Sequence, residues 1–388
     1  MKNYFKKLGL FHWLLNRPYS KFSRFFIGLL FFIICIIIFF DFRLGNLFFI
    51  RVLINNDLKS ESRRLIWCLK KSYLPISLKT DIMFDFCSGL NLNELNKIKN
   101  VLKRLKNSKK DIFYEIDLLK ILAYECDFLI ENKDNIPISK LSKKFNSQYL
   151  KVKNYLEKRP AKKILKPHNK LSKKNMGIDS LKAKKVLLDL ACLFELNKIK
   201  WFVLAGTFLG FIREKSFLRH DLDIDIGLMS EDVSLAQIKE VLRKSPLFEI
   251  SKIEYQKYFL SANNFLNKPT FARIIHKNGI TLDIFWHFLE GNKIYHGTSS
   301  ILWKNTPFEL NEYEVYGLKV KGPKNANLYL KETYGNWRKE KLNYNFHRDM
   351  ISLTGTNNFL GLEYLLRRKL YCGKYNQEEL TKIEKLLI

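Results

Sequence analysis

The sequence lacks the short motifs by which several large enzyme classes are recognised. It contains no P-loop pattern, no Gly-x-Gly-x-x-Gly fingerprint, no His-Glu-x-x-His and no Gly-x-Ser-x-Gly. P-loop nucleotide hydrolysis, Rossmann-type dinucleotide binding, zinc proteolysis and serine hydrolysis are therefore without support. A helix-turn-helix, zinc-finger or RNP-type signature is also missing. We accordingly expect no nucleic acid among the partners of this protein.

Cysteine is scarce and follows no pattern. The six cysteines never occur as Cys-x-x-Cys, and the chain contains no Asn-x-Ser/Thr sequon although Asn is abundant. Scattered thiols are typical of a reducing compartment and argue against a disulfide framework or a zinc cluster. The missing sequon disfavours a eukaryotic secretory lumen.

Acidic residues are few beside basic ones. The chain has 68 Lys and Arg against 38 Asp and Glu, a formal net charge of +30. Such an excess predicts an anionic partner, which is a nucleic acid, an anionic lipid or a phosphorylated substrate. Because no nucleic-acid motif is present and the charge is spread through the chain, anionic membrane and phosphorylated substrates are favoured.

The sequence contains one long apolar run. Residues 1–24 form a basic tail without an acid, and the unbroken run FFIGLLFFIICIIIFF follows at Phe25–Phe40. We predict a membrane segment at 25–42, slightly short for a bilayer that needs about 20 residues. A cleaved signal peptide is disfavoured because bulky residues follow the run, and a buried soluble helix is the remaining alternative. Basic residues flank the run on both sides, so charge does not fix its orientation.

The rest of the chain divides by composition. Residues 43–150 show helical periodicity, clearest at Asn93–Leu105 and Asp111–Ile130, and predict an all-α region. Residues 151–174 are rich in Lys and hold two prolines, which predicts a basic linker that could contact anionic lipid. Residues 175–388 carry the strand patterns and the chemistry, and we assign them to a catalytic domain.

The densest pattern lies at residues 201–229. It opens with an apolar run that suits a buried strand, Trp201–Leu204, and continues through Gly206-Thr207 into a short helical pattern. It closes on the sequence DIDIG, which begins at Asp223. A strand, a small turn, a helix and an acidic strand are thereby placed in one continuous unit.

Asp223 and Asp225 point to the same side of a strand, because side chains alternate between its faces. Two adjacent carboxylates repel each other unless a cation lies between them, and Mg²⁺ or Mn²⁺ prefers such oxygen ligands. Alone, this pattern more often marks the solvated face of an edge strand. A third carboxylate, Asp283, lies on a later strand pattern and favours a metal site.

The elements after residue 229 fit a mixed sheet. Ser230, followed by two acids, predicts the cap of a helix that runs to about Lys244. Strands are expected at 248–260, 270–276 and 280–288, with Asn278-Gly279 as a hairpin turn between the last two. A further helix is expected from about Asn325 to Tyr334.

These residues resemble the LicD and fukutin family of phosphoryl-alcohol transferases, whose fold is that of the nucleotidyltransferases. The resemblance covers roughly the C-terminal half. It rests on Gly206-Thr207, Leu209-Gly210, Arg213, Phe217-Leu218, Asp221, Asp223–Gly227, Asp283-Ile284-Phe285, Gly317–Asn325 and Tyr334-Gly335-Asn336-Trp337. The chain departs from the family at Leu222, where many bacterial members continue a run of acids. Asp221 could still act as an outer partner of the site.

The resemblance implies an α/β (α+β) catalytic domain that moves a phospho-alcohol group, such as phosphocholine or ribitol phosphate. The donor would be CDP-linked, and the acceptor a hydroxyl of a cell-surface glycan or a lipid-linked saccharide. Asp223, Asp225 and Asp283 would hold the metal, and Asp283 could also act as the general base.

The residues expected around the donor phosphates supply donors rather than carboxylates. Gly206 would allow close approach of the backbone, and Thr207 could donate to a phosphate oxygen. Arg213 and Arg273 could clamp phosphate oxygens, although a surface role suits Arg273 equally. His220, next to Asp221, is a better candidate than His347 for a polar group near the site.

Two other functions stay open. One is nucleotidyl transfer to a small molecule with the same carboxylates, and the other is an inactive scaffold of a polysaccharide assembly complex. We expect the apolar run to form a single N-terminal anchor. Because CDP-linked donors are made in the cytosol, we expect the catalytic domain on the cytosolic face of a bacterial inner membrane.

Overall fold

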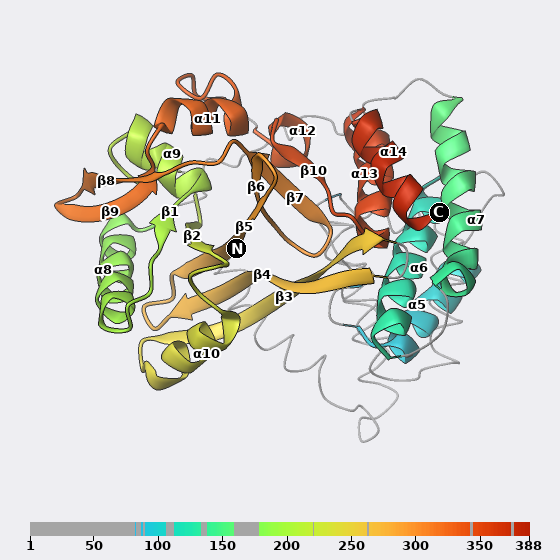
Figure 1. Ribbon diagram of the computed structural model, residues 1–388, viewed down its shortest axis with the longest axis horizontal. Coiled ribbons are helices and arrows are strands. Elements are labelled where there is room, and N and C mark those ends of the chain that lie inside the picture. The colour runs from blue at the N-terminus through green and yellow to red at the C-terminus, as the bar shows by residue number, and fades with distance from the viewer. Residues whose placement is uncertain are drawn as a thin grey trace, which may run out of the picture. The chain divides into compact units, whose positions relative to one another are not determined.

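The computed structural model describes residues 82, 87, 90–105, 112–132, 138–158, 178–219, 221–261, 264–341, 344–373 and 376–388 (Figure 1). The chain folds into two compact units, Met1–Pro160 and Ala161–Ile388. The first is helical where it is described, and the second contains every described strand.

The first unit contains three described helices, α5 (Leu92–Leu105), α6 (Ile112–Asn132) and α7 (Ile138–Glu157). Leu95 and Ile98 bury the apolar face of α5, as the periodicity predicts. The predicted helices at 93–105 and 111–130 are thereby confirmed to within two residues. The first seven residues of the predicted basic linker, 151–157, form the end of α7.

No described helix combines the length and the apolar character needed to cross a bilayer. The apolar run Phe25–Phe40, on which the membrane prediction depends, lies outside the described residues.

The second unit is built on an eight-stranded mixed sheet. Its main path runs β1-β2-β5-β6-β7-β10, while β4 pairs with both β5 and β3. The strands are β1 (Phe202–Val203), β2 (Asp223–Met229), β3 (Phe248–Ser261), β4 (Asn264–His276), β5 (Thr281–Glu290), β6 (Lys293–Gly297), β7 (Ile301–Asn305) and β10 (Leu353–Gly355). A separate hairpin joins β8 (Leu310–Val315) and β9 (Leu318–Pro323). β2 and β5 are parallel, and every other pair is antiparallel.

Seven described helices accompany this sheet. They are α8 (Ser180–Leu196), α9 (Ala205–Arg213), α10 (Leu235–Lys244), α11 (Ala326–Tyr334), α12 (Phe346–Asp349), α13 (Phe359–Cys372) and α14 (Gln377–Leu387). Side-chain caps fix several starts, with Asp179 on α8 and Asn325 on α11. The predicted cap at Ser230 is wrong. Ser234 caps α10 instead, because residues 230–232 form a turn after β2.

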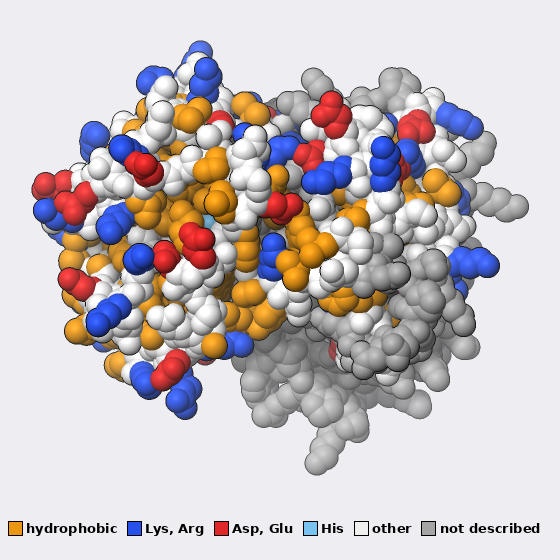
Figure 2. Space-filling view, viewed as in Figure 1, with side chains coloured by type: hydrophobic (Ala, Val, Ile, Leu, Met, Phe, Trp, Pro, Cys, Tyr) orange, Lys and Arg blue, Asp and Glu red, His pale blue; other side chains and the backbone are white. Residues whose placement is uncertain are grey.

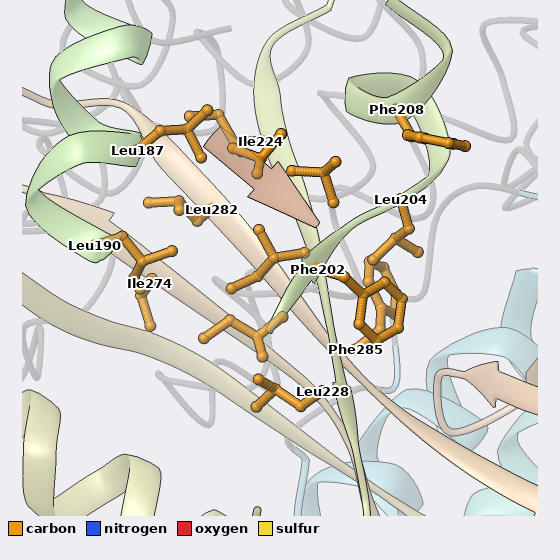
Figure 3. Packing of buried hydrophobic residues seen from close by; sticks show 14 of the residues in the cluster. Leu187, Leu190, Phe202, Leu204, Phe208, Ile224, Leu228, Ile274, Leu282 and Phe285 are labelled. Atoms are coloured by element: carbon orange, nitrogen blue, oxygen red, sulfur yellow. The ribbon is translucent and has the colours of Figure 1, made fainter. Parts of the chain in front are cut away.

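The core of the second unit lies between α8 and the central strands. Leu187 and Leu190 of α8 pack over Ile224, Leu282 and Ile274, which come from β2, β5 and β4 (Figure 3). Alternation along β2 buries its isoleucines on this side and turns its aspartates to the other. The core therefore fixes the face on which the acidic side chains stand.

Candidate active site

Three neighbouring strands bring charged side chains into one row. In the ladders, Asp225 of β2 lies beside Asp283 of β5, and Asp283 lies beside Arg273 of β4. Cross-strand partners project from the same face of a sheet. Residues that are 10 to 58 positions apart in the sequence therefore meet side by side.

The turn before α9 closes tightly around the acids. The Gly206 N–H donates to Asp225 Oδ2 at 3.2 Å. A Cβ atom on Gly206 would lie 2.5 Å from Asp221 Oδ2 and 3.4 Å from Asp225 Oδ2. The missing side chain of Gly206 thus makes room for two carboxylates at once.

The backbone of this turn is held from two sides. Thr207 is buried in the first turn of α9, and its hydroxyl accepts a hydrogen bond from the Asp225 N–H at 2.8 Å. Ala205 has a φ of 48°, which is unusual for a residue with a side chain. Its N–H donates to the phenol oxygen of Tyr329 on α11 at 3.3 Å. Backbone strain of this kind is found at functional sites that the surrounding structure over-determines.

Arg273 forms the shortest polar contacts of the row. Its Nε and Nη2 donate to the two oxygens of Asp283, both at 2.6 Å, and Nη2 also reaches Asp223 Oδ2 at 3.3 Å. This fork-to-fork geometry is strong and directional. The guanidinium thus joins the carboxylate of β5 to one carboxylate of β2.

The acids are crowded and only partly neutralised. Burial raises the pKa of Asp221 to about 6, and the charge of Asp283 adds to this. The pKa of Asp223 is also raised to about 6, by burial and by the nearby Asp221. Burial raises the pKa of Asp283 to about 6 although Arg273 opposes it, and burial with three neighbouring carboxylates raises that of Asp225 well above its usual range. One guanidinium does not balance four carboxyl groups, so the site favours additional cations.

The donor chemistry suits a hard divalent ion, although no complete cage is present. Among the described residues, no group of three or more His, Cys, Asp and Glu side chains is arranged to hold a metal ion. Mg²⁺ commonly takes one or two protein carboxylates and completes its shell with water and substrate phosphate. Asp223 and Asp225 fit that smaller role, since Arg273 binds both oxygens of Asp283 at 2.6 Å but only one oxygen of Asp223, at 3.3 Å.

The predicted phosphate-binding residues separate into two groups. Gly206, Thr207 and Arg273 lie among the acids, as their hydrogen bonds show. Arg213 instead donates to the backbone carbonyl of Trp337 at 3.1 Å and to Glu214 at 2.7 Å. The bond to Trp337 ties the end of α9 to the segment after α11.

Of the two histidines considered from the sequence, the structure describes one. His220 lies outside the described residues. His347 is buried, and its Nδ1 lies 2.9 Å from the hydroxyl of Tyr364 on α13. This contact with α13 favours a structural role for His347.

Two tyrosines of α11 approach the acids without having been predicted to do so. Tyr329 binds the backbone at Ala205, and burial together with the charge of Asp225 raises its pKa. Burial also raises the pKa of Tyr334, with smaller contributions from nearby tyrosines and from Asp225 and Asp221. The only sequence signal was the high density of aromatic residues around α11.

Residues 198–325 match the family model of LicD/FKTN/FKRP, nucleotidyltransferase domain. Two uncharacterised rickettsial proteins are similar to this chain. Protein RP689 of Rickettsia prowazekii (strain Madrid E) is 28% identical over 181 residues, covering 44% of this chain and 60% of its own length. Protein RT0683 of Rickettsia typhi (strain ATCC VR-144 / Wilmington) is 25% identical over 157 residues, covering 39% of this chain and 45% of its own length. Each match spans less than two thirds of the relative.

Among solved structures, the lincomycin-bound lincosamide antibiotic adenylyltransferase LnuA shows 16% identity and a TM-score of 0.26, with 40% of this chain and 86% of that chain covered. This likeness is too weak to carry an argument about substrate. The family match is more informative, because residues 198–325 include all four carboxylates and Arg273. The resemblance to the LicD/fukutin family is thereby confirmed over residues 198–325, the nucleotidyltransferase domain that contains this acidic site.

Proposed function

We propose that this protein transfers a phospho-alcohol group, such as phosphocholine or ribitol phosphate, from a CDP-linked donor to a sugar hydroxyl. The acceptor would be a cell-surface glycan or a lipid-linked saccharide. The family supports a transferase with a nucleotidyltransferase domain. The observation that carries the proposal is the row Asp225–Asp283–Arg273, with Asp221 and Asp223 beside it.

A diphosphate donor brings negative charge to a site that already holds four carboxyl groups. Asp223 and Asp225 would hold Mg²⁺ or Mn²⁺, which when bound neutralises the diphosphate and stabilises the developing charge. The Gly206 N–H fixes the orientation of the Asp225 carboxylate through the 3.2 Å hydrogen bond. The Thr207 hydroxyl still has its own hydrogen to donate, since in this structure it accepts from the Asp225 N–H.

Asp283 is suited to receive the proton of the acceptor hydroxyl. Its pKa is raised to about 6 by burial, so the carboxylate is ionised at neutral pH and close to the range that favours general-base catalysis. Arg273 keeps it ionised and fixes its orientation. A carboxylate has about four acceptor sites, so the two bonds from Arg273 leave room for a substrate hydroxyl.

The proposed step is balanced without a further reactant. The acceptor oxygen bonds to the phosphorus that carries the alcohol, and the bond from that phosphorus to the bridging oxygen breaks. CMP leaves with the bridging oxygen, and Asp283 takes the proton of the acceptor hydroxyl.

The test uses the purified full chain in detergent with CDP-choline or CDP-ribitol, a mixed pool of surface glycans and Mg²⁺. Release of CMP together with labelled glycan is expected, and chelation should abolish both. Asp223→Asn and Asp225→Asn should remove transfer while the fold is preserved, because each removes a ligand charge. Near-normal transfer in either variant would contradict the metal assignment.

The same assay separates the alternatives. Release of pyrophosphate from a nucleoside triphosphate with a small-molecule acceptor would support nucleotidyl transfer instead. If the protein binds neither Mg²⁺ nor any CDP-linked compound in calorimetry, it is a scaffold.

A further inference from the structure

Helix α8 has two faces of different environment. Ala183, Val186, Leu187, Leu190 and Phe194 are buried against the sheet. On the opposite side, Leu181, Leu188, Cys192 and Leu196 follow one another at helical spacing, and we call these four residues the outer stripe. Leu181 and Leu196 are each 82% exposed, and Leu188 is 41% exposed.

The outer stripe reverses the usual pattern of a surface helix, which is polar at the centre of its exposed face. A single exposed leucine needs no explanation. Aligned leucines on one helix are different, because they place several apolar side chains on one exposed face, here with Lys184 and Lys185 between Leu181 and Leu188. Figure 2 shows hydrophobic side chains reaching the surface at the left edge, where Figure 1 places α8, with charged side chains among them.

Lysines outnumber acids around the outer stripe. Lys182 and Lys185 lie beside it on α8, and Lys200 follows the helix, with side chains 58%, 61% and 69% exposed. Each of the three pairs with an acid, namely Asp179, Asp189 and Asp232. In residues 179–200, five lysines face three acids. The basic segment 158–174 precedes α8 in the sequence.

We propose that α8 is a membrane-contact surface whose outer stripe enters the headgroup boundary of an anionic bilayer. Leucines on one side with flanking lysines are typical of interfacial helices, and lysine side chains extend their ammonium groups to lipid phosphates while their stems stay apolar. Juxtamembrane basic segments add attraction to the anionic leaflet. A symmetric dimer through α8 fits less well, because it would bring the same lysines of two copies together.

Cys192 offers a probe within the outer stripe, since it is exposed while Cys87, Cys126 and Cys372 are buried. A full chain that keeps Cys192 as its sole cysteine would carry a nitroxide there. Its collisions with oxygen and with a water-soluble nickel chelate would be measured in vesicles with about 30% phosphatidylglycerol and in purely zwitterionic vesicles. We expect nickel accessibility to fall about threefold in the anionic vesicles, with a rise for oxygen. The same label on Lys319→Cys, an exposed position of β9, should not change.

The triple variant Leu181→Gln, Leu188→Gln and Leu196→Gln should abolish the change at Cys192. Its matched control replaces three other exposed leucines by Gln, namely Leu260, Leu266 and Leu289. The control should behave like the parent. Equal loss in both triple variants, or a label as open to nickel in anionic vesicles as in water, would overturn the proposal.

A second measurement leaves the cysteines in place. Amide hydrogen exchange of the unmodified chain should slow in α8 in anionic bilayers relative to zwitterionic ones. Protection that is already present in detergent and depends on protein concentration would instead show a second copy on α8, and would overturn the lipid assignment. Because transfer activity is not measured, failure here is distinct from failure of the proposed transferase function.

Discussion

At the scale of single residues, the space beside Gly206 is the most sensitive part of the site. A methyl group there would lie 2.5 Å from Asp221 Oδ2, so Gly206→Ala must displace that carboxylate. We expect a loss of transfer activity of at least tenfold with little change in thermal stability. The measurement is kcat/KM beside a melting curve.

A double-mutant cycle identifies the cause. If the methyl group acts through the Asp221 carboxylate, Gly206→Ala should have little further effect in an Asp221→Ala background. A full additive loss in the double variant would show that the glycine is needed for another reason, such as close approach of the donor phosphates.

Arg273 influences the ionisation of Asp283 and, if Asp283 is the proposed base, the pH dependence of the proposed reaction. The guanidinium lowers the pKa of Asp283, against burial that raises it to about 6. Arg273→Gln removes this charge, so the pKa of Asp283 must rise, and the acidic limb of the kcat/KM profile should move to higher pH. Activity lost at pH 7 should partly return near pH 9.

The matched control is Lys319→Gln, a change of the same charge at a position with a 73% exposed side chain. Its pH profile should coincide with that of the parent. An unshifted profile in Arg273→Gln would exclude Asp283 as the group that titrates in catalysis.

The sequence identified the carboxylates more readily than their neighbours. Asp223 and Asp225 stand out because they alternate with isoleucines on one strand, and Asp283 repeats that pattern. The ion pair from Arg273 to Asp283 depends on the antiparallel register of β4 and β5, which local pattern does not encode. Tyr329 reaches Ala205 from 124 residues away, a contact that no periodicity reveals.

At the scale of elements, the strands β5, β6 and β7 carry a stack of aromatic rings. His287 and His296 stack with ring centroids 4.3 Å apart, and His296 stacks on Trp303 at 5.3 Å. His287 Nε2, His296 Nδ1 and Trp303 Nε1 are buried without a hydrogen-bond partner. Burial lowers the pKa of His287 to about 3 and that of His296 well below its usual value.

These histidines should make the fold sensitive to acid. Since their pKa values are lower in the folded than in the unfolded chain, where His titrates near pH 6.5, the unfolded chain binds more protons below that pH. Stability is then complete above about pH 6.5 and falls with decreasing pH. At pH 5 the lowered pKa of His287 alone should cost about 2 kcal/mol, and His296 acts in the same direction.

Replacing His296 by Phe tests this effect, since the ring keeps its packing but cannot be protonated. Chemical denaturation at pH 7 and pH 5 should show a smaller difference for His296→Phe than for the parent. The carboxyl groups with raised pKa act in the opposite direction between about pH 6 and pH 4, so the comparison between variants isolates the histidine. An unchanged pH dependence would contradict the assignment.

Elements with strong periodicity or clear turn chemistry were predictable. The Asn278-Gly279 turn joins β4 and β5 as expected, with Gly279 at a φ of 90°. The helix predicted at Ser230 begins at Leu235, because acids in a turn imitate the first turn of a helix. The short strands β6, β7 and β10 were not predicted individually, since five or fewer residues give little periodic signal.

At the scale of the whole molecule, sidedness follows from where the donor is made. If the proposed CDP-linked donor is used, it is cytosolic, so we expect the second unit to face the cytosol if residues 25–42 anchor the chain. Cys372 is buried and unsuitable for labelling. Lys319→Cys, as the sole thiol, should resist a membrane-impermeant maleimide in intact cells and react after permeabilisation. Reaction in intact cells would place the domain on the opposite side.

The parallel pairing of β2 with β5 also has a consequence during synthesis. β2 ends at Met229 and β5 begins at Thr281, so at about 5–20 residues per second the ribosome needs about 3 to 10 s to supply the partner strand. During that interval one edge of β2, rich in isoleucine, has no partner and could join another nascent chain. Asp223 and Asp225 place charge at alternate positions on one face of that strand, which opposes such pairing by repulsion. The carboxylates proposed for catalysis would thus also protect the unfinished protein from aggregation.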